Sequence, residues 1–244
     1  MKNKIGLIGI GRWGKKIASV LSGYENFGGY VVSRNTENND WMSQSFKKLQ
    51  QENLDYMLST TSPYESVIIA TPMETHPDLV RRALSVNKHV LIEKPMTCKF
   101  STAKELHLLA KEKGLILFTG YEFSLDSKFE NIDFNNINSY SSTWNKWGSF
   151  ENHIITNLAV HDIAIACMVL GSVESVTEVN LSNEDNVLLL KMKHARGNSH
   201  IMIDRLKNES TRKISLTDSE SGENMIFQPS DLLLDHEIEK FTLA

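Results

Sequence analysis

Two stretches decide the fold: residues 68–76, with the sequence IIATPMETH, and residues 88–95, with the sequence KHVLIEKP. Each begins as a short apolar run and ends in polar residues beside a proline, Thr71-Pro72 in the first and Glu93-Lys94-Pro95 in the second. Both runs predict buried parallel strands. In an open α/β sheet, the carboxyl ends of such strands form the edge where ligands bind. Lys94 is therefore a candidate for proton transfer at that edge.

The composition is that of an ordinary globular protein. Of the 244 residues, 41% are hydrophobic and 23% charged, and 26 basic against 30 acidic side chains give a net charge of −4. There is no basic run typical of nucleic-acid binding, the longest apolar stretch (residues 163–170) is too short to cross a bilayer, and the first residues do not resemble a signal peptide. The two cysteines, Cys98 and Cys167, have no metal-ligand spacing. We expect a cytoplasmic protein that binds no metal, nucleic acid or membrane.

Residues 1–120 alternate short apolar runs with helical patterns, which predicts an α/β domain with a parallel sheet. The expected strands are 4–8, 29–33, 66–70, 89–92 and 115–119. The expected helices are 15–22, 77–86 and 101–113, the last capped by Ser101 and ended by Gly114.

The pattern changes after Gly120, which predicts a second domain over residues 121–244. Residues 131–142 are rich in Asn and Ser and are interpreted as a linker. A helix is expected over 154–170, followed by strands at 173–181, 187–193, 199–205 and 213–216. The alternation of apolar and polar residues in 190–193 favours an antiparallel sheet with one covered face.

The first motif is Gly9-Ile10-Gly11-Arg12-Trp13-Gly14, between the first expected strand and the first helix. In a dinucleotide-binding turn, Gly9 permits the tight bend, Gly11 lets the backbone approach a pyrophosphate, and Gly14 allows close packing of helix on strand. The helix N-terminus then offers N–H groups to the phosphates. A glycine-rich structural turn is the alternative, but the strand and helix around the motif favour a nucleotide.

The second expected strand ends at Ser33, followed by Arg34. An acidic residue about twenty positions after the glycine motif favours NAD, because it accepts hydrogen bonds from the ribose. Ser33 leaves room for a 2′-phosphate and Arg34 supplies a cation, so NADP is favoured over NAD. The alternative is that Arg34 is a solvated loop charge.

These motifs resemble the glucose-fructose oxidoreductase and inositol dehydrogenase family of nicotinamide-dependent sugar oxidoreductases. The resemblance rests on the glycine motif, Thr71-Pro72 with Thr75-His76, residues 88–95, and the segment Asn157–Asp162. It implies a Rossmann domain, then an α/β domain with an open sheet often used for dimerisation. It also implies hydride transfer at a sugar-like hydroxyl or carbonyl carbon.

The resemblance assigns roles to the residues at the strand ends. Arg12, Trp13 and His76 would join the three glycines in cofactor binding. The nicotinamide ribose and ring would be surrounded by Thr71, Pro72, Glu93 and Lys94. Lys94 would also be catalytic, since burial and a nearby cation lower a lysine pKa. Pro95 holds Lys94 in an extended conformation, and a cis Lys94–Pro95 bond is an open alternative.

In the second domain, Asn157 and His161 are four residues apart and share one helical face. His161 matches the family histidine that transfers the substrate hydroxyl proton, a task suited to a group that titrates near neutral pH. The family aspartate four residues earlier is Asn157 here, which hydrogen-bonds but does not accept a proton at ordinary pH. Without the resemblance, a packed histidine would be the simpler interpretation of His161.

The sequence and this resemblance therefore predict an NAD(P)-dependent oxidoreductase that acts on a sugar, nucleotide sugar or polyol. The protein is expected to form a homodimer. Two alternatives stay open. Asn157, and a chain shorter than is usual for the family, favour a dinucleotide-binding protein without turnover. Family members that use the nicotinamide transiently suggest a lyase or hydrolase reaction instead.

Overall fold

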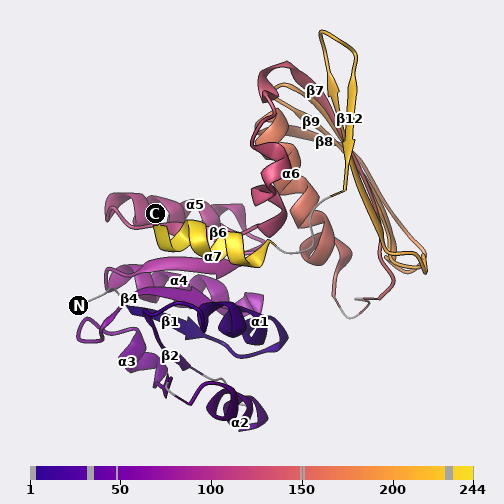
Figure 1. Ribbon diagram of the computed structural model, residues 1–244. Helices are drawn as coiled ribbons and strands as arrows, with labels where there is room; N and C mark the ends of the chain where they lie inside the picture. The colour runs from indigo at the N-terminus through magenta and orange to yellow at the C-terminus, as the bar shows by residue number, and fades with distance from the viewer. Residues whose placement is uncertain are drawn as a thin grey trace. The chain divides into compact units, whose positions relative to one another are not determined.

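The computed structural model describes residues 4–31, 36–47, 49–148, 150, 152–228 and 233–243. The chain divides into two compact units, a first unit of Met1–Gly120 with Leu234–Ala244 and a second unit of Tyr121–Leu233. The C-terminal helix α7 (Leu234–Leu243) thus belongs to the first unit, whereas the sequence analysis assigned all of 121–244 to the second domain. Figure 1 shows both units and the labelled elements.

The first unit is built on a sheet of six parallel strands in the order β3-β2-β1-β4-β5-β6. They are β1 (Lys4–Ile8), β2 (Phe27–Val31), β3 (Gln50–Gln51), β4 (Tyr64–Ile69), β5 (His89–Glu93) and β6 (Leu117–Gly120). The strand order reverses direction between β1 and β4, which is the place where ligands bind in doubly wound sheets.

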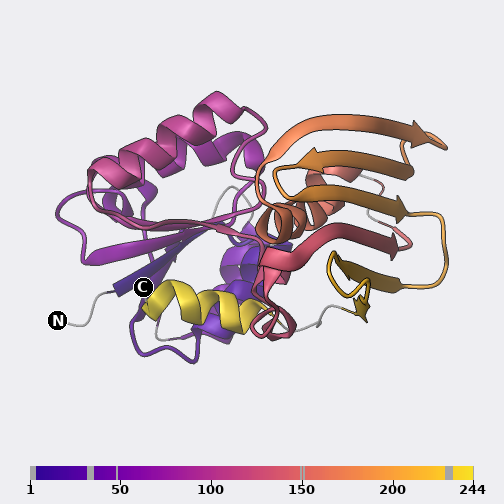
Figure 2. The same ribbon diagram turned by 90° about the horizontal axis from the view of Figure 1, so that it is seen from above.

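Helices cover both faces of this sheet, because successive residues of its buried strands are apolar on both sides. The helices are α1 (Arg12–Leu21), α2 (Thr36–Ser45), α3 (Leu54–Met57), α4 (His76–Ser85), α5 (Phe100–Glu112) and α7. In β4, Ile68 packs in a cluster with residues of α1 and α7, while Val67 and Ile69 pack in another with α4 and α5. Figure 2 shows α7, in yellow at the C-terminus, and α5 on opposite sides of the sheet.

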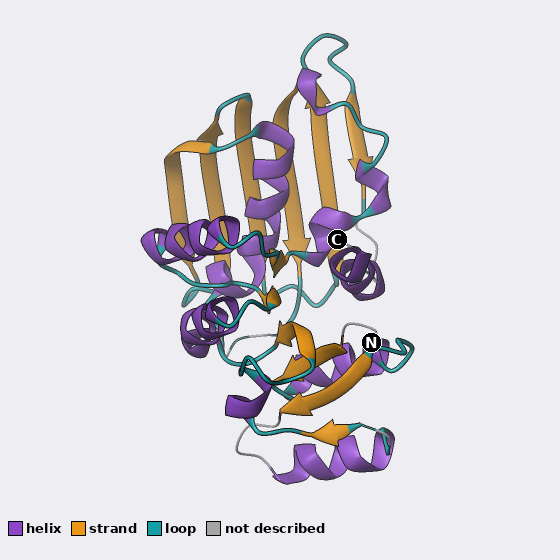
Figure 3. Cartoon of the chain, turned by 90° about the vertical axis from the view of Figure 1, so that its left-hand side faces the viewer, coloured by secondary structure: helices purple, strands orange, loops and turns teal. Residues whose placement is uncertain are grey.

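The second unit is a mixed, mostly antiparallel sheet of six strands in the order β12-β11-β7-β10-β9-β8, seen side by side in Figure 3. They are β7 (Ile137–Asn145), β8 (Val173–Ser182), β9 (Val187–His194), β10 (Gly197–Asp204), β11 (Thr211–Asp218) and β12 (Asn224–Phe227). Only β7 and β10 run parallel among these described strands. The apolar helix α6 (Val160–Leu170) lies along one face (Figure 1) and shares a core with Ile201, Ile203 and Ile214.

The linker expected over residues 131–142 is wrong, because β7 occupies its second half and lies inside the sheet. Ile137, Tyr140, Ser142 and Trp144 of β7 are buried, and the residues between them are more exposed. This is strand periodicity carried by an unusual number of Ser and Asn residues. The high content of Ser and Asn therefore led to the wrong prediction for a strand that lies inside the sheet.

Two helix predictions also change in detail. The expected helix over 154–170 is a π-helical turn, η5 (Ile155–Ala159), followed directly by α6. Ser101 lies inside α5, whose N-cap is Lys99 without a side-chain cap, so the predicted Ser101 cap is wrong. Helices α2, α3 and α7 were not predicted.

Candidate active site

The glycine motif forms the turn from β1 into α1. Gly9 has φ +97°, and a Cβ there would lie 2.7 Å from the Ala70 carbonyl oxygen, so a side chain is excluded at this residue. A Cβ on Gly14 would collide with the Gly9 carbonyl oxygen. At Gly11, the N-cap of α1, an added Cβ would meet no atom within 4 Å, and no side chain caps the helix. The turn is thus closely packed against the protein at Gly9 and Gly14, and it leaves open space at Gly11, beside the N-terminus of α1.

Thr71, the second residue after β4, lies at the same edge. The Thr75 hydroxyl donates to the Pro72 carbonyl oxygen at 2.7 Å and lies 2.6 Å from the Thr71 hydroxyl. Because Thr75 has one hydroxyl proton, Thr71 is the donor to Thr75. The lone pairs of the Thr71 oxygen are then the part of this side chain that can accept a hydrogen bond from a ligand hydroxyl.

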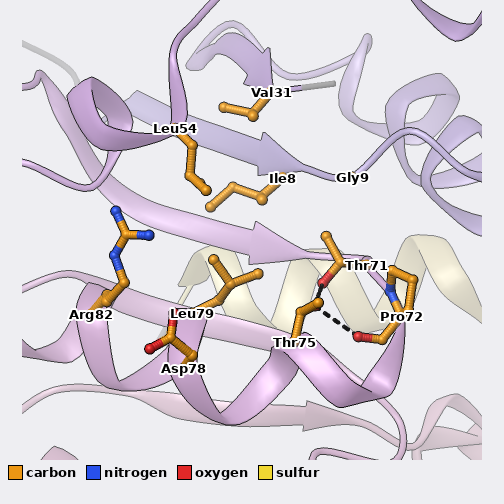
Figure 4. Close-up of a pocket in the computed structure, with 10 residues that line it drawn as sticks. All are labelled: Ile8, Gly9, Val31, Leu54, Thr71, Pro72, Thr75, Asp78, Leu79 and Arg82. Carbon is orange, nitrogen blue, oxygen red and sulfur yellow. Dashed lines mark hydrogen bonds between the residues drawn. The ribbon is translucent and has the colours of Figure 1, made fainter. Parts of the chain in front are cut away.

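A pocket of about 620 Å³ runs along this edge (Figure 4), within the range of small-molecule and cofactor sites. Thr71, Pro72 and Thr75 line one end, and Asp78 and Arg82 of α4 line the other. The remaining lining residues are Gly9 and the apolar Ile8, Val31, Leu54 and Leu79. Arg82 also forms an ion pair of 2.6 Å with Asp55 of α3.

Of these lining residues, the sequence motifs include Gly9, Thr71, Pro72 and Thr75. For Asp78, Leu79 and Arg82 the signal is helical spacing. Since α4 starts at the Thr71-Pro72 edge, residues 75, 78, 79 and 82 recur on one face and extend along the pocket.

Glu93, the last residue of β5, accepts a hydrogen bond from the indole N–H of Trp13 in α1. This contact joins the glycine turn to the strand that carries Lys94. Lys94 follows directly, is partly exposed, and is joined to Pro95 by a cis peptide bond. Arg12, predicted to bind cofactor, is exposed at the first position of α1. Ser33 and Arg34 lie outside the described residues.

His76, predicted to bind the cofactor, is instead buried, with 1% of its surface exposed. Its Nε2 lies 2.8 Å from the Thr71 carbonyl oxygen and its Nδ1 lies 3.0 Å from that of Pro95. Burial lowers the pKa of His76, and the two carbonyl contacts oppose that shift. His76 thus contacts the loops that follow β4 and β5, at Thr71 and Pro95.

In the second unit, His161 is buried in the first turn of α6 between two aromatic rings. Its ring centroid lies 4.9 Å from that of Phe123 in η2 (Glu122–Leu125) and 6.2 Å from that of Trp144 in β7, both edge-on. Asn157 lies one turn earlier in the π-helical segment η5 and is half-buried. π-Helical turns are frequent at functional sites.

The residue after His161, Asp162, is fully buried and turned to the sheet. Its Oδ1 accepts a 2.8 Å hydrogen bond from the Tyr140 hydroxyl and lies 3.2 Å from Arg212 Nη2. The Arg212 guanidinium stacks 3.9 Å from the Phe123 centroid and 4.1 Å from that of Trp144. Burial, and secondly the Asp162 charge, raise the pKa of Tyr140 well above 10. Asp162 is thus engaged in an ion pair with Arg212, a residue that was not predicted from the sequence.

Neither a metal site nor a membrane span emerges from the described ranges. They contain no group of three His, Cys, Asp or Glu side chains that could hold a metal ion. None of the described helices combines the length and the apolar character needed to cross a membrane.

Comparison with known proteins places the first unit in a family. Residues 3–121 match the family described as "Oxidoreductase family, NAD-binding Rossmann fold". The dTDP-3,4-didehydro-2,6-dideoxy-alpha-D-glucose 3-reductase of Streptomyces violaceoruber is 34% identical over 93 residues, which are 38% of this chain and 27% of that protein. Biliverdin reductase A of Mus musculus is 32% identical over 136 residues, 53% of this chain and 43% of that protein. The chain aligns with less than half the length of these curated relatives.

The likeness in fold extends over both units. The structure of UDP-N-acetylglucosamine 3-dehydrogenase GnnA from Acidithiobacillus ferrooxidans superposes with a TM-score of 0.82 at 19% identity, covering 99% of this chain and 88% of that one. The predicted α/β fold class is thereby confirmed. Residues 3–121, which carry the glycine motif and both strand-end motifs, thus match the glucose-fructose oxidoreductase and inositol dehydrogenase family of oxidoreductases.

Proposed function

We propose that this protein is an NAD(P)-dependent oxidoreductase that transfers a hydride to or from a hydroxyl or carbonyl carbon of a sugar, nucleotide sugar or polyol. The observation that carries the proposal is the edge of the first sheet at the β1–β4 reversal. There the turn admits no side chain at Gly9 or Gly14, Gly11 leaves open space at the start of α1, and the pocket continues from Gly9 along α4.

These residues fit a dinucleotide. The N–H groups at the start of α1 would hold the pyrophosphate, and the apolar walls at Leu54 and Leu79 suit a flat adenine ring. The nicotinamide end would lie at Thr71, Pro72, Glu93 and Lys94. NADP is favoured over NAD because Arg34 offers a cation where the family reads the ribose.

The chain's own residues would handle the proton. A bound nicotinamide accepts or supplies hydride. During oxidation of a hydroxyl group, Lys94 Nζ or the His161 ring takes the hydroxyl proton, and during reduction of a carbonyl it returns that proton. Asn157 orients the hydroxyl by hydrogen bonding, since an amide does not exchange a proton at ordinary pH.

The relatives support a carbohydrate-like substrate. Two of the similar proteins are named for work at position 3 of a nucleotide sugar, one as a reductase and one as a dehydrogenase. Biliverdin reductase A, a protein named for a different substrate, is 32% identical over 136 residues of the chain. We assign substrate selection to the second unit, which holds His161 and Asn157.

We further propose that the protein forms a homodimer through the face of the second sheet opposite α6. Met202 and Leu189 are paired on that face, beside Thr143 of β7. Ile226, on β12, is exposed and pairs with Ser215. Ser139 and Ser141 of β7 alternate with its buried residues and add small polar side chains to the centre of this face, and the ion pair of Lys191 with Glu178 lies nearer its edge. Light scattering on the wild type and on Met202→Glu tests the assignment, which predicts a dimer and a monomer respectively. A monomeric wild type contradicts it.

The decisive experiment for the function is a fluorescence titration of the protein with NADPH and with NADH. We expect tight binding of NADPH and weaker binding of NADH, and Arg34→Ala should abolish the difference while retaining NADH affinity. A screen of nucleotide sugars and polyols with the preferred cofactor then identifies the substrate. Absence of binding by both cofactors would refute the proposal.

A further inference from the structure

His76 connects two loops that follow neighbouring strands. Thr71 follows β4 and Pro95 follows β5, and the two strands are paired in parallel. The His76 ring bridges them through contacts of 2.8 Å to the Thr71 carbonyl oxygen and 3.0 Å to the Pro95 carbonyl oxygen. A single imidazole therefore ties the Thr71-Pro72 edge to the peptide unit next to Lys94.

The two carbonyl contacts would each need an N–H donor from the ring. A carbonyl oxygen only accepts hydrogen bonds, and a neutral imidazole has one N–H. The neutral ring therefore donates to one loop and turns a lone pair toward the carbonyl of the other. The imidazolium form has two N–H groups and donates to both. Since the ring is 1% exposed, bulk water does not replace the missing donor.

We propose that His76 is a positioning residue for Lys94: in its imidazolium form it fastens the Pro95 loop to the Thr71 loop, and on losing a proton it releases one of them. The edge formed by the Thr71 and Pro95 loops then exists in a fastened and a loosened form, which differ by one proton on the His76 ring. The part of this inference that concerns Lys94 and cofactor affinity rests on the proposed function, whereas the proton-dependent bridge does not.

The surroundings of His76 set the pH range in which this change occurs. Burial is the largest influence and lowers the pKa below its ordinary value of 6.5, while the two carbonyls and the Glu74 carboxylate of η1 (Met73–Thr75) raise it. Asp78 lies two residues after His76 on α4, and Lys94 precedes Pro95, whose carbonyl oxygen the ring contacts. The fastened form is therefore populated below the lowered pKa, and the bridge opens as pH rises through it.

The direct test is a titration of the ¹⁵N-labelled protein without cofactor, followed by NMR of the histidine rings and of the backbone. We expect both ring nitrogens of His76 to carry protons at the acidic end. We also expect the amide signals of Thr71 and Lys94 to move with the same midpoint as the ring. A ring that keeps one neutral tautomer from pH 5 to pH 8, or loop signals that ignore its titration, would overturn the inference.

The functional test is the affinity for NADH between pH 5.5 and pH 7.5, with NADH chosen because it lacks the titrating 2′-phosphate. The wild type should bind at least about threefold more tightly at the acidic end, a difference of about 0.65 kcal/mol. His76→Gln, which donates to one carbonyl at a time, should have an affinity independent of pH. His107→Gln, at an exposed histidine on α5, is the matched control and should follow the wild type.

The outcomes separate the two proposals. A His76→Gln variant that retains the full pH dependence contradicts the positioning role. If the wild type binds no dinucleotide at any pH, the proposed function fails, and the cofactor-free NMR titration still decides whether His76 operates the bridge. The same titration decides the matter if His76→Gln does not fold.

Discussion

The Tyr140 hydroxyl donates a 2.8 Å hydrogen bond to Asp162 Oδ1, and both side chains are fully buried. This bond joins β7, inside the second sheet, to the helix that covers it. The same carboxylate oxygen faces Arg212 of β11 at 3.2 Å. Three elements of the second unit therefore share one charge pair beneath His161.

Replacing Asp162 by Asn should destabilise the second unit strongly. The Arg212 side chain, 9% exposed, would keep its charge without a carboxylate, and breaking a buried ion pair in this way costs about 3–5 kcal/mol. Tyr140→Phe is the matched control, because it removes one hydrogen bond and keeps the charge pair, at about 1–2 kcal/mol. Urea unfolding of both variants measures the difference. Equal losses would show that the ion pair contributes little.

Tyr140 also predicts a loss of stability in alkaline solution. Its pKa is raised well above 10 in the folded protein, first by burial and then by the Asp162 charge. The folded state thus holds a proton that the unfolded chain releases near pH 10, so the stabilisation is complete below pH 10 and declines as pH rises above it. Unfolding free energies at pH 9 and pH 11 should differ less in Tyr140→Phe than in the wild type. An identical slope in the two proteins would exclude Tyr140 as the source.

Gly11 and Gly14 should respond differently to alanine. A Cβ on Gly11 meets no protein atom, so Gly11→Ala should fold with unchanged stability but bind NADPH at least about tenfold more weakly, roughly 1.4 kcal/mol. A Cβ on Gly14 collides with the Gly9 carbonyl oxygen, so Gly14→Ala should also unfold more easily, by about 1–3 kcal/mol. Thermal unfolding and fluorescence titration distinguish the two. Undiminished NADPH affinity in Gly11→Ala would argue against a pyrophosphate at that turn.

Lys94→Ala should lower turnover by about 10²–10⁴-fold, the usual contribution of a positioned acid–base group. Cofactor affinity should remain within about threefold of the wild type, since the glycine turn and the pocket are untouched. Lys99→Ala, at an exposed residue just before α5, serves as the control. Full activity in Lys94→Ala would remove Lys94 from the mechanism.

The first unit was readily predictable because its signals are local. Each buried strand is a short apolar run, and the glycine motif lies where a strand becomes a helix, so the parallel sheet and its ligand edge follow from neighbouring residues. α2 escaped prediction because it has few apolar residues, and its sequence TENNDWMSQS shows little amphipathic pattern. Its place in the fold depends on Met42, which is buried in the core under the sheet.

The second unit was less predictable because its determinants are distant in the chain. β7 resembles a linker in composition, and its pairing with β10 and β11 supplies the reason it is a strand. Arg212 reaches Asp162 from another strand, and no local pattern marks it. His76 was assigned to the ligand from its motif, whereas its contacts with two backbone carbonyls exist only once β4 and β5 are paired.

The return of α7 to the first unit has a consequence for biosynthesis. Ile238 and Phe241 of α7 are buried in the same core as Ile17 and Leu21 of α1. The core around α1 is therefore complete only after residues more than 200 positions later have been synthesised. The second unit, continuous from Tyr121 to Leu233, has no such delay. On the ribosome, the nascent chain will therefore acquire its second sheet domain while the nucleotide-binding domain still exposes an apolar groove, which makes that groove the natural target of chaperones during translation.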